Sequence, residues 1–220
     1  MKKRILLLDH IKEFLNDRSN FNNIKYRSEA DLQFELGYFL RSKKEFDNVR
    51  FEYQFKDIYK NSNEILKKEA DICVLNNDNG SVDVCIEIKL LKDDSGTTNF
   101  FASCFEDICY LLQLKNKAEI SRGYFVLICA STKSITSQRK SLGSRFWKGF
   151  VPNEIGEMNK LKELSDYKKE DLPSKSSWHH QKLRDFIKTD KALNSLAGKK
   201  IEYFFKPEKN PKYAYCILEL

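Results

Sequence analysis

Two stretches of sequence decide the fold: Glu69-Ala70-Asp71-Ile72-Cys73-Val74 and Val84-Cys85-Ile86-Glu87-Ile88-Lys89-Leu90. They belong to predicted strands over 70–75 and 82–91, because both are rich in the β-branched residues that favour strands. The segment between them, Asn76-Asn77-Asp78-Asn79-Gly80, has the composition of a tight turn. We therefore expect the two strands to form a hairpin.

Period-two alternation sorts the second strand into an apolar face and a mixed face. The mixed face carries Asp83, Cys85, Glu87 and Lys89. The hairpin can bring Asp71 beside Glu87, and two carboxylates a few ångströms apart repel each other unless a cation lies between them. The pair therefore suits a hard ion such as Mg²⁺. Lys89 points into the same cleft, where it can orient or help deprotonate a water and stabilise charge on a phosphoryl group.

A plainer interpretation of the same pattern is an edge hairpin whose solvent face carries Asp, Glu and Lys. Cross-strand charge pairs on such a face contribute only about 0.2 to 1 kcal/mol each. Acid-x-Lys also occurs a second time, at Asp166 to Lys168, so the spacing alone is not specific. The strand pattern leaves the catalytic and the structural interpretation open.

The elements around the hairpin indicate an α/β fold. Helical spacing of apolar residues predicts helices over 4–17, 29–43 and 99–116, the second capped by Ser28. Strands are predicted over 49–55 and 124–130. The resulting order of helix, three strands, helix and strand is typical of helices packed on a central sheet.

The remainder of the chain is expected to complete one domain over residues 1–220, whose core spans about 28–130. A length of 220 residues fits one domain at a rough prior of about 150 residues each. Residues 154–177 are predicted to form a short helix and an exposed loop. A helix over about 178–195 and strands over 201–205 and 213–218 follow.

Composition excludes disordered, fibrous and membrane-spanning classes. The hydrophobic share is 41%, and the longest apolar run, Tyr124 to Ala130, is far shorter than the roughly 20 residues that a membrane helix needs. The apolar stretch near the start is too short for a signal peptide, so we expect a cytoplasmic protein without membrane partners. The six cysteines form no CxxC motif and are expected to be buried thiols.

At this point the sequence resembles the PD-(D/E)XK nuclease superfamily, also called restriction-endonuclease-like. The match is Asp71 followed, after 15 intervening residues, by Glu87-Ile88-Lys89, with an acidic helix before and a helix and a strand after. It covers about residues 28–130 and implies a central mixed sheet flanked by helices in the order αβββαβ. The departure is Ala70, where the family name has proline, a position that varies in the superfamily.

The resemblance also implies roles for individual residues. Asp71, Glu87 and the main-chain carbonyl of Ile88 would bind Mg²⁺, for which Mn²⁺ can substitute, and Lys89 would be the catalytic lysine. Many members add a glutamate from the first core helix, for which Glu29 is our choice and Glu35 the alternative. Gln113, late in the third helix, is a candidate accessory residue, although a surface position on an amphipathic helix is the favoured interpretation.

A basic segment is the candidate nucleic-acid contact. Residues 120–153 contain no Asp or Glu but six Lys and Arg residues, which concentrates the formal net charge of +7. Cations and aromatics that could grip phosphates and stack on bases are Arg139, Lys140, Arg145, Trp147 and Lys148. An ordinary basic loop with its aromatics turned inward is equally compatible with this segment.

The sequence thus favours a Mg²⁺-dependent endonuclease that hydrolyses phosphodiester bonds in DNA, of restriction or defence type. A homodimer would let two sites address the two strands. Two alternatives stay open: a non-catalytic module that binds nucleic acid or protein with the same fold, and a nuclease directed at RNA.

Overall fold

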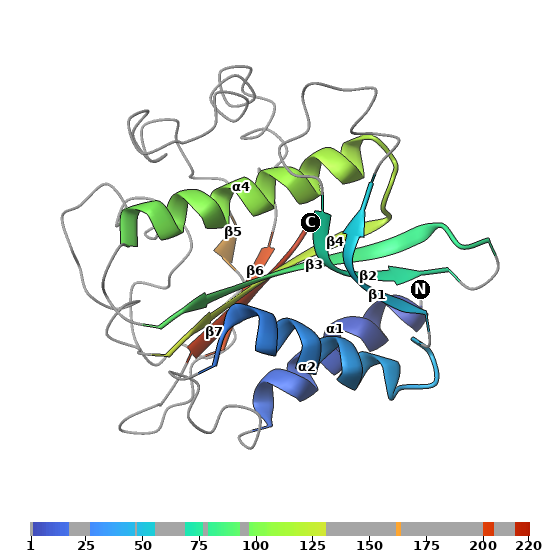
Figure 1. Cartoon of the computed structure of the whole chain (residues 1–220), viewed down its shortest axis with the longest axis horizontal. Coiled ribbons are helices and arrows are strands. Elements are labelled where there is room, and N and C mark those ends of the chain that lie inside the picture. The colour runs from blue at the N-terminus through green and yellow to red at the C-terminus, as the bar shows by residue number, and fades with distance from the viewer. Residues whose placement is uncertain are drawn as a thin grey trace.

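The computed structural model describes residues 2–17, 27–46, 48–55, 69–76, 79–92, 97–130, 162–163, 200–204 and 214–220 (Figure 1). Its elements in chain order are α1 (Lys2–Asn16), α2 (Glu29–Arg41), β1 (Val49–Gln54), β2 (Glu69–Leu75), β3 (Val82–Leu91), α4 (Thr97–Asn116), β4 (Arg122–Cys129), β5 (Lys162–Glu163), β6 (Lys200–Phe204) and β7 (Ala214–Glu219). The chain is an α/β protein, and the predicted order of helix, three strands, helix and strand is present as α2-β1-β2-β3-α4-β4.

The described strands form one mixed sheet in the order β1-β2-β3-β4-β7-β6-β5. Strands β3 and β4 run parallel, whereas every other neighbouring pair among the described strands is antiparallel. Parallel neighbours need a long crossover, and α4 provides it between the end of β3 and the start of β4. The central position of β3 follows from its composition, because a strand buried on both faces is apolar along most of its length.

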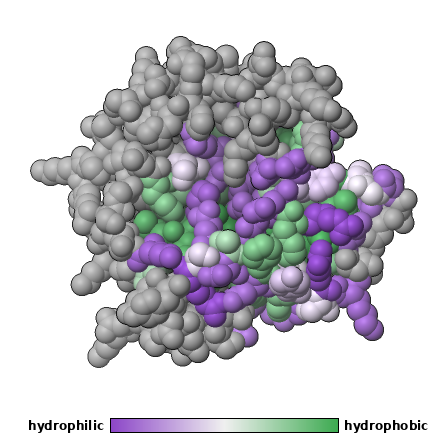
Figure 2. Space-filling view, viewed as in Figure 1, coloured by the Kyte–Doolittle hydropathy of each residue, from purple (hydrophilic) through white to green (hydrophobic). Residues whose placement is uncertain are grey.

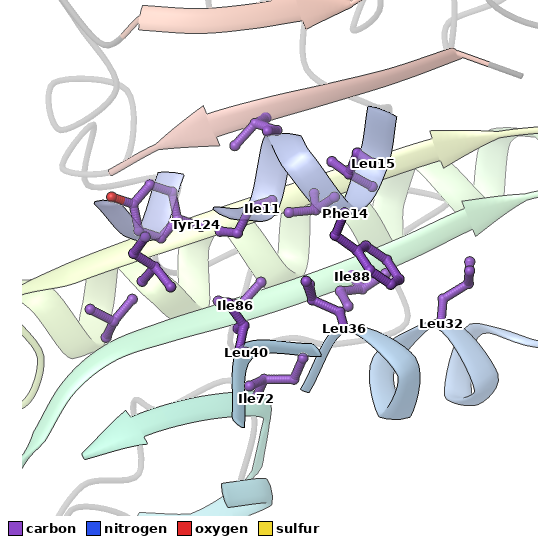
Figure 3. Close-up of a cluster of buried hydrophobic side chains, with 14 of the residues drawn as sticks. Ile11, Phe14, Leu15, Leu32, Leu36, Leu40, Ile72, Ile86, Ile88 and Tyr124 are labelled. Carbon is purple, nitrogen blue, oxygen red and sulfur yellow. The ribbon is translucent and has the colours of Figure 1, made fainter. Parts of the chain in front are cut away.

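Helices cover both faces of the sheet (Figure 1): α1 and α2 lie on one face and α4 on the other. The core between α1, α2 and the sheet is drawn in Figure 3, where side chains from both layers point toward each other. Its labelled members are Ile11, Phe14, Leu15, Leu32, Leu36, Leu40, Ile72, Ile86, Ile88 and Tyr124. The apolar face predicted for β3 is therefore the face that α1 and α2 bury.

Helix α2 begins with a capping box, as the sequence predicts for Ser28. The Asp31 N–H donates to Ser28 Oγ (3.0 Å), and the Ser28 N–H donates to Asp31 Oδ2 (2.7 Å). Two N–H groups that a helix start would otherwise leave unpaired are thereby satisfied. The cap fixes Glu29 as the first residue of the helix.

The predicted hairpin is confirmed. Strands β2 and β3 are antiparallel with Cys73 opposite Cys85, and their Sγ atoms lie 2.7 Å apart. In the turn, the Asn76 N–H donates to the Ser81 carbonyl (2.8 Å), and Gly80 has a φ of 69°, which glycine adopts without steric cost. All six cysteines are free and buried, as predicted.

The C-terminal strands predicted over 201–205 and 213–218 are present as β6 and β7. The helix over 178–195 lies outside the described residues, and so does the segment 154–177 except for β5. Within the described ranges, none of the helices has the length and apolar character required to cross a membrane. Hydrophilic side chains cover much of the described surface in Figure 2, in keeping with a charged share of 32%.

Candidate active site

The site lies where β2 separates from β3. Their paired register extends as far as Ile72 and Ile86, while β3 continues to Leu91 alongside β4. Two main-chain N–H groups beyond that point are bound by carboxylates instead: the Ile88 N–H donates to Asp71 Oδ2 (2.8 Å) and the Leu90 N–H donates to Glu29 Oε2 (3.2 Å). Both acids are thus fixed against the backbone of the strand that carries Glu87 and Lys89.

Asp71 is held through its main chain as well as through its carboxylate. Its carbonyl accepts a hydrogen bond of 2.6 Å from Gln33 Nε2 on α2, a side chain that is 6% exposed. On the other neighbouring strand, the register of β1 and β2 omits the pair of Glu52 and Asp71, and Glu52 has a φ of 47°. Gln33 therefore binds the Asp71 backbone at a point where the sheet is irregular on both sides.

Glu87 is fully buried, with 0% of its surface exposed. By strand alternation Glu87 lies on the same side of β3 as Cys85, whose Sγ is 2.7 Å from that of Cys73 on β2. Burial, with the nearby Glu87 carboxylate as a further cause, raises the pKa of Tyr110 on α4. The mixed face of β3 is consequently covered by α4, and the edge hairpin with a solvent face is not what the chain forms.

Lys89 lies between two carboxylates. Its Nζ is 2.9 Å from Glu29 Oε1 and 2.9 Å from Asp107 Oδ2, and its side chain is 13% exposed. Burial by itself would lower the pKa of Lys89, but Asp107 and Glu29 outweigh that effect and raise it above the ordinary value of 10.5. Lys89 is therefore an ammonium group at neutral pH, which suits charge stabilisation rather than deprotonation of a water.

The two candidate glutamates of α2 are placed differently. Glu29, in the first turn, reaches both Lys89 Nζ and the Leu90 N–H. Glu35 instead forms an ion pair with Arg27. The structure brings Glu29, and not Glu35, to Lys89.

Sequence reasoning missed Asp107 and misjudged Gln113. Asp107 is 3% exposed and pairs with Lys89, although it resembles any acid of a charged chain. The signal that could have found it is its position on the buried stripe of α4, three residues after Cys104 and four before Leu111, which are both fully buried. Gln113 is 6% exposed, so the favoured expectation of a surface position is wrong. It lies on a helix that packs against both β3 and β4.

The oxygen donors fit a magnesium ion in kind. Asp71 and Glu87 are carboxylates on neighbouring strands, each one residue beyond the last paired position, and Mg²⁺ is commonly held by one or two carboxylates plus waters and substrate phosphates. No cluster of three or more His, Cys, Asp or Glu side chains able to hold a metal occurs in the part of the chain that the structure describes. The ligand set that the resemblance implies is Asp71, Glu87 and the Ile88 carbonyl, whereas the Glu29 carboxylate contacts Lys89.

The candidate nucleic-acid contacts fall outside the described residues. They are Arg139, Lys140, Arg145, Trp147 and Lys148, within the undescribed segment 131–161. Comparisons of the chain with protein-family models, with curated proteins and with solved structures found no match.

Proposed function

We propose that this protein is a Mg²⁺-dependent endonuclease of restriction-endonuclease-like fold that hydrolyses phosphodiester bonds in DNA. The observation that carries the proposal is the position of Lys89, an ammonium group held by Glu29 and Asp107 one residue after Ile88, whose N–H binds the Asp71 carboxylate. Glu29 and Asp107 each lie 2.9 Å from Lys89 Nζ, and Asp71 on β2 and Glu87 on β3 add two further carboxylates to this part of the sheet. The excess of negative charge is a physical reason for a divalent cation to bind there.

Asp71, Glu87 and the Ile88 carbonyl would hold the metal. A bound Mg²⁺ supplies an activated water and neutralises charge that develops on the scissile phosphate. The chain's own contribution is rigid placement, because Asp71 is fixed by the Ile88 N–H and by Gln33. Lys89 donates hydrogen bonds to a phosphate oxygen as an ammonium group and stabilises the negative charge of the transition state.

Charge supports a nucleic-acid substrate. The chain carries a formal net charge of +7, and residues 120–153 include six Lys and Arg residues and no acid. Positive charge of this kind attracts a polyphosphate backbone and makes binding weaken with salt. A restriction or defence role, a cytoplasmic location and a homodimeric assembly form part of the same proposal.

The deciding experiment is incubation of supercoiled plasmid with the full-length protein and Mg²⁺, followed by gel analysis. The parent should nick or linearise the plasmid, and EDTA should stop the reaction. Lys89→Met and Asp71→Asn, both close in shape to the native residues, should lose cleavage by at least about 100-fold while retaining the parent's circular dichroism spectrum.

Asp83→Asn is the matched control, because it removes a carboxylate from the same strand, β3. Asp83 is partly exposed, and its side chain lies near Arg122, with 4.0 Å between Oδ2 and Nη2. This variant should cleave like the parent. Parent-like cleavage by either Lys89→Met or Asp71→Asn would contradict the site assignment. Matched RNA and DNA duplexes in the same assay separate a DNA enzyme from one directed at RNA.

One observation favours a second function, a non-catalytic binding module. Lys89 is already neutralised by Glu29 and Asp107, so the cluster is also intelligible as a buried ion-pair network that supports the fold. Calorimetric titration with Mn²⁺ distinguishes the two functions. Saturable binding that Asp71→Asn weakens supports the enzyme, whereas its absence, together with retained DNA binding, supports the module.

A further inference from the structure

The two carboxylates that contact Lys89 differ in how freely they can leave it. The Asp107 side chain is 4% exposed, and that of Glu29 is 40% exposed. Both lie 2.9 Å from Lys89 Nζ, so their distances to the ammonium group are equal. The difference is in their surroundings: one acid belongs to a packed interface and the other to a partly exposed first turn.

The attachment of Asp107 is rigid. Its neighbours Cys104 and Ile108 on α4 are both 0% exposed, so the helix is packed against the sheet on either side of the acid. A buried carboxylate separated from its cation loses its compensation for desolvation, which is a large penalty. Glu29 is the more exposed partner, so water can replace more of what its carboxylate would lose on leaving Lys89, while its Oε2 still accepts from the Leu90 N–H.

We propose that Asp107 is the positioning residue of this site: it keeps the Lys89 ammonium group in place when the more exposed Glu29 carboxylate leaves it. This inference rests on the proposed function, in which Lys89 stabilises negative charge on the scissile phosphate. An amine with a flexible four-carbon stem would otherwise move when one of its two partners left. Asp107 thus acts through Lys89 and does not itself contact substrate or metal.

The first test separates positioning from metal binding in the plasmid assay with the full-length chain. Asp107→Asn should lower kcat by about 10- to 100-fold, the usual effect of losing a supporting partner, with the Mg²⁺ half-saturation and KM for DNA unchanged. Glu29→Gln, which removes the charge of the more exposed partner of Lys89, should lower kcat less than Asp107→Asn does. Asp107→Glu, which keeps the charge, should retain more of the parent's kcat than Asp107→Asn does.

The second test does not depend on cleavage. Asp107→Asn should lower the midpoint of urea unfolding in the parent, and this shift should disappear or reverse in a Lys89→Met background, where the buried acid has lost its cation. Asp83→Asn, the control, should give the same small shift in both backgrounds. The corresponding cycle between Glu29→Gln and Lys89→Met should show a much smaller coupling.

Each outcome bears on one proposal. Equal midpoint shifts for Asp107→Asn in the two backgrounds, an unchanged kcat, or a raised Mg²⁺ half-saturation would overturn the positioning role. If Asp107→Asn does not fold, Asp107→Glu is compared with the parent instead, by the same three quantities: kcat, the Mg²⁺ half-saturation and the midpoint shifts in the two backgrounds. A parent that leaves DNA intact overturns the proposed function, and the midpoints then report separately whether Asp107 holds Lys89.

Discussion

The Asp71 carboxylate accepts a hydrogen bond of 2.8 Å from the main-chain N–H of Ile88, across two strands whose paired register has already ended. An acid thus occupies the place that a strand carbonyl would take in a continuous ladder. A carboxylate takes the same place two residues later on β3, where Glu29 accepts a hydrogen bond from the Leu90 N–H. Where β2 and β3 separate, main-chain donors of β3 therefore orient the carboxylates of Asp71 and Glu29.

Asp71→Asn should separate the structural role of this side chain from its charge. The amide oxygen can still accept from the Ile88 N–H, so the free energy of unfolding should change by less than about 1 kcal/mol. The affinity for Mn²⁺, measured by calorimetry, should fall by at least about tenfold because a charged ligand is lost. Unchanged Mn²⁺ binding would remove Asp71 from the metal site.

Gln33→Leu should destabilise the protein by about 1 to 3 kcal/mol, measured by urea unfolding. The substitution leaves the Asp71 carbonyl without its donor at a partly buried position, and an acceptor left unsatisfied away from water carries a desolvation penalty. Gln54→Leu is the matched control, because its amide donates to Glu69 at an exposed position. That change should cost less than about 0.5 kcal/mol, and equal effects of the two substitutions would refute the bracing role of Gln33.

The acid side of the stability profile should depend on Asp31. Hydrogen bonds from the Ser28 N–H and then the Ser28 hydroxyl lower the pKa of Asp31 below its ordinary 3.8. A carboxyl with a lowered folded pKa stabilises the fold above the ordinary value, and this contribution is lost as the pH falls through the folded value. Asp31→Asn should therefore be less stable than the parent at neutral pH and approach it in acid.

The measurement is the free energy of unfolding in urea at a series of pH values from about 6 down to about 2. Asp9→Asn, at an exposed position of α1, is the control for the loss of one surface carboxylate from a helix. A constant difference between Asp31→Asn and the parent across this range would show that the capping box does not depend on the charge of Asp31.

The sequence predicted what local chemistry determines. Strand β3 has the predicted bounds of Val82 and Leu91, because alternation and a turn rich in Asn and Gly act over a few residues. Ser28 was identifiable as a cap for the same reason. These features locate Asp71 and Glu87 on neighbouring strands before any tertiary contact is known.

Contacts between elements that are distant in the sequence could not be predicted in the same way. Nothing near Asp107 in the sequence indicates that α4 crosses over β3 and delivers this acid to Lys89, 18 positions earlier in the chain. The choice of Glu29 over Glu35 came from a family resemblance, whereas the structure distinguishes them by partners, Lys89 for one and Arg27 for the other. The way a helix crosses the sheet decides which of its polar residues are buried. This crossing depends on contacts between residues that are far apart in the sequence.

Gly37→Ala tests how closely α2, which carries Glu29 and Gln33, must approach β1. Helix propensity alone would favour alanine by about 1 kcal/mol. A Cβ at Gly37, however, would overlap the ring of Phe51 on β1. Overpacking costs about 1 to 3 kcal/mol, so the net effect on the free energy of unfolding should be destabilising.

The control for this prediction is the same change in a Phe51→Leu background, where the ring that meets the new methyl group is absent. Gly37→Ala should there be neutral or stabilising, which reverses its sign. Because α2 also holds Gln33 against the Asp71 carbonyl, a helix displaced by the methyl group should weaken Mn²⁺ binding as well. A destabilisation of equal size in both backgrounds would mean that the contact with Phe51 does not set the distance between α2 and the sheet.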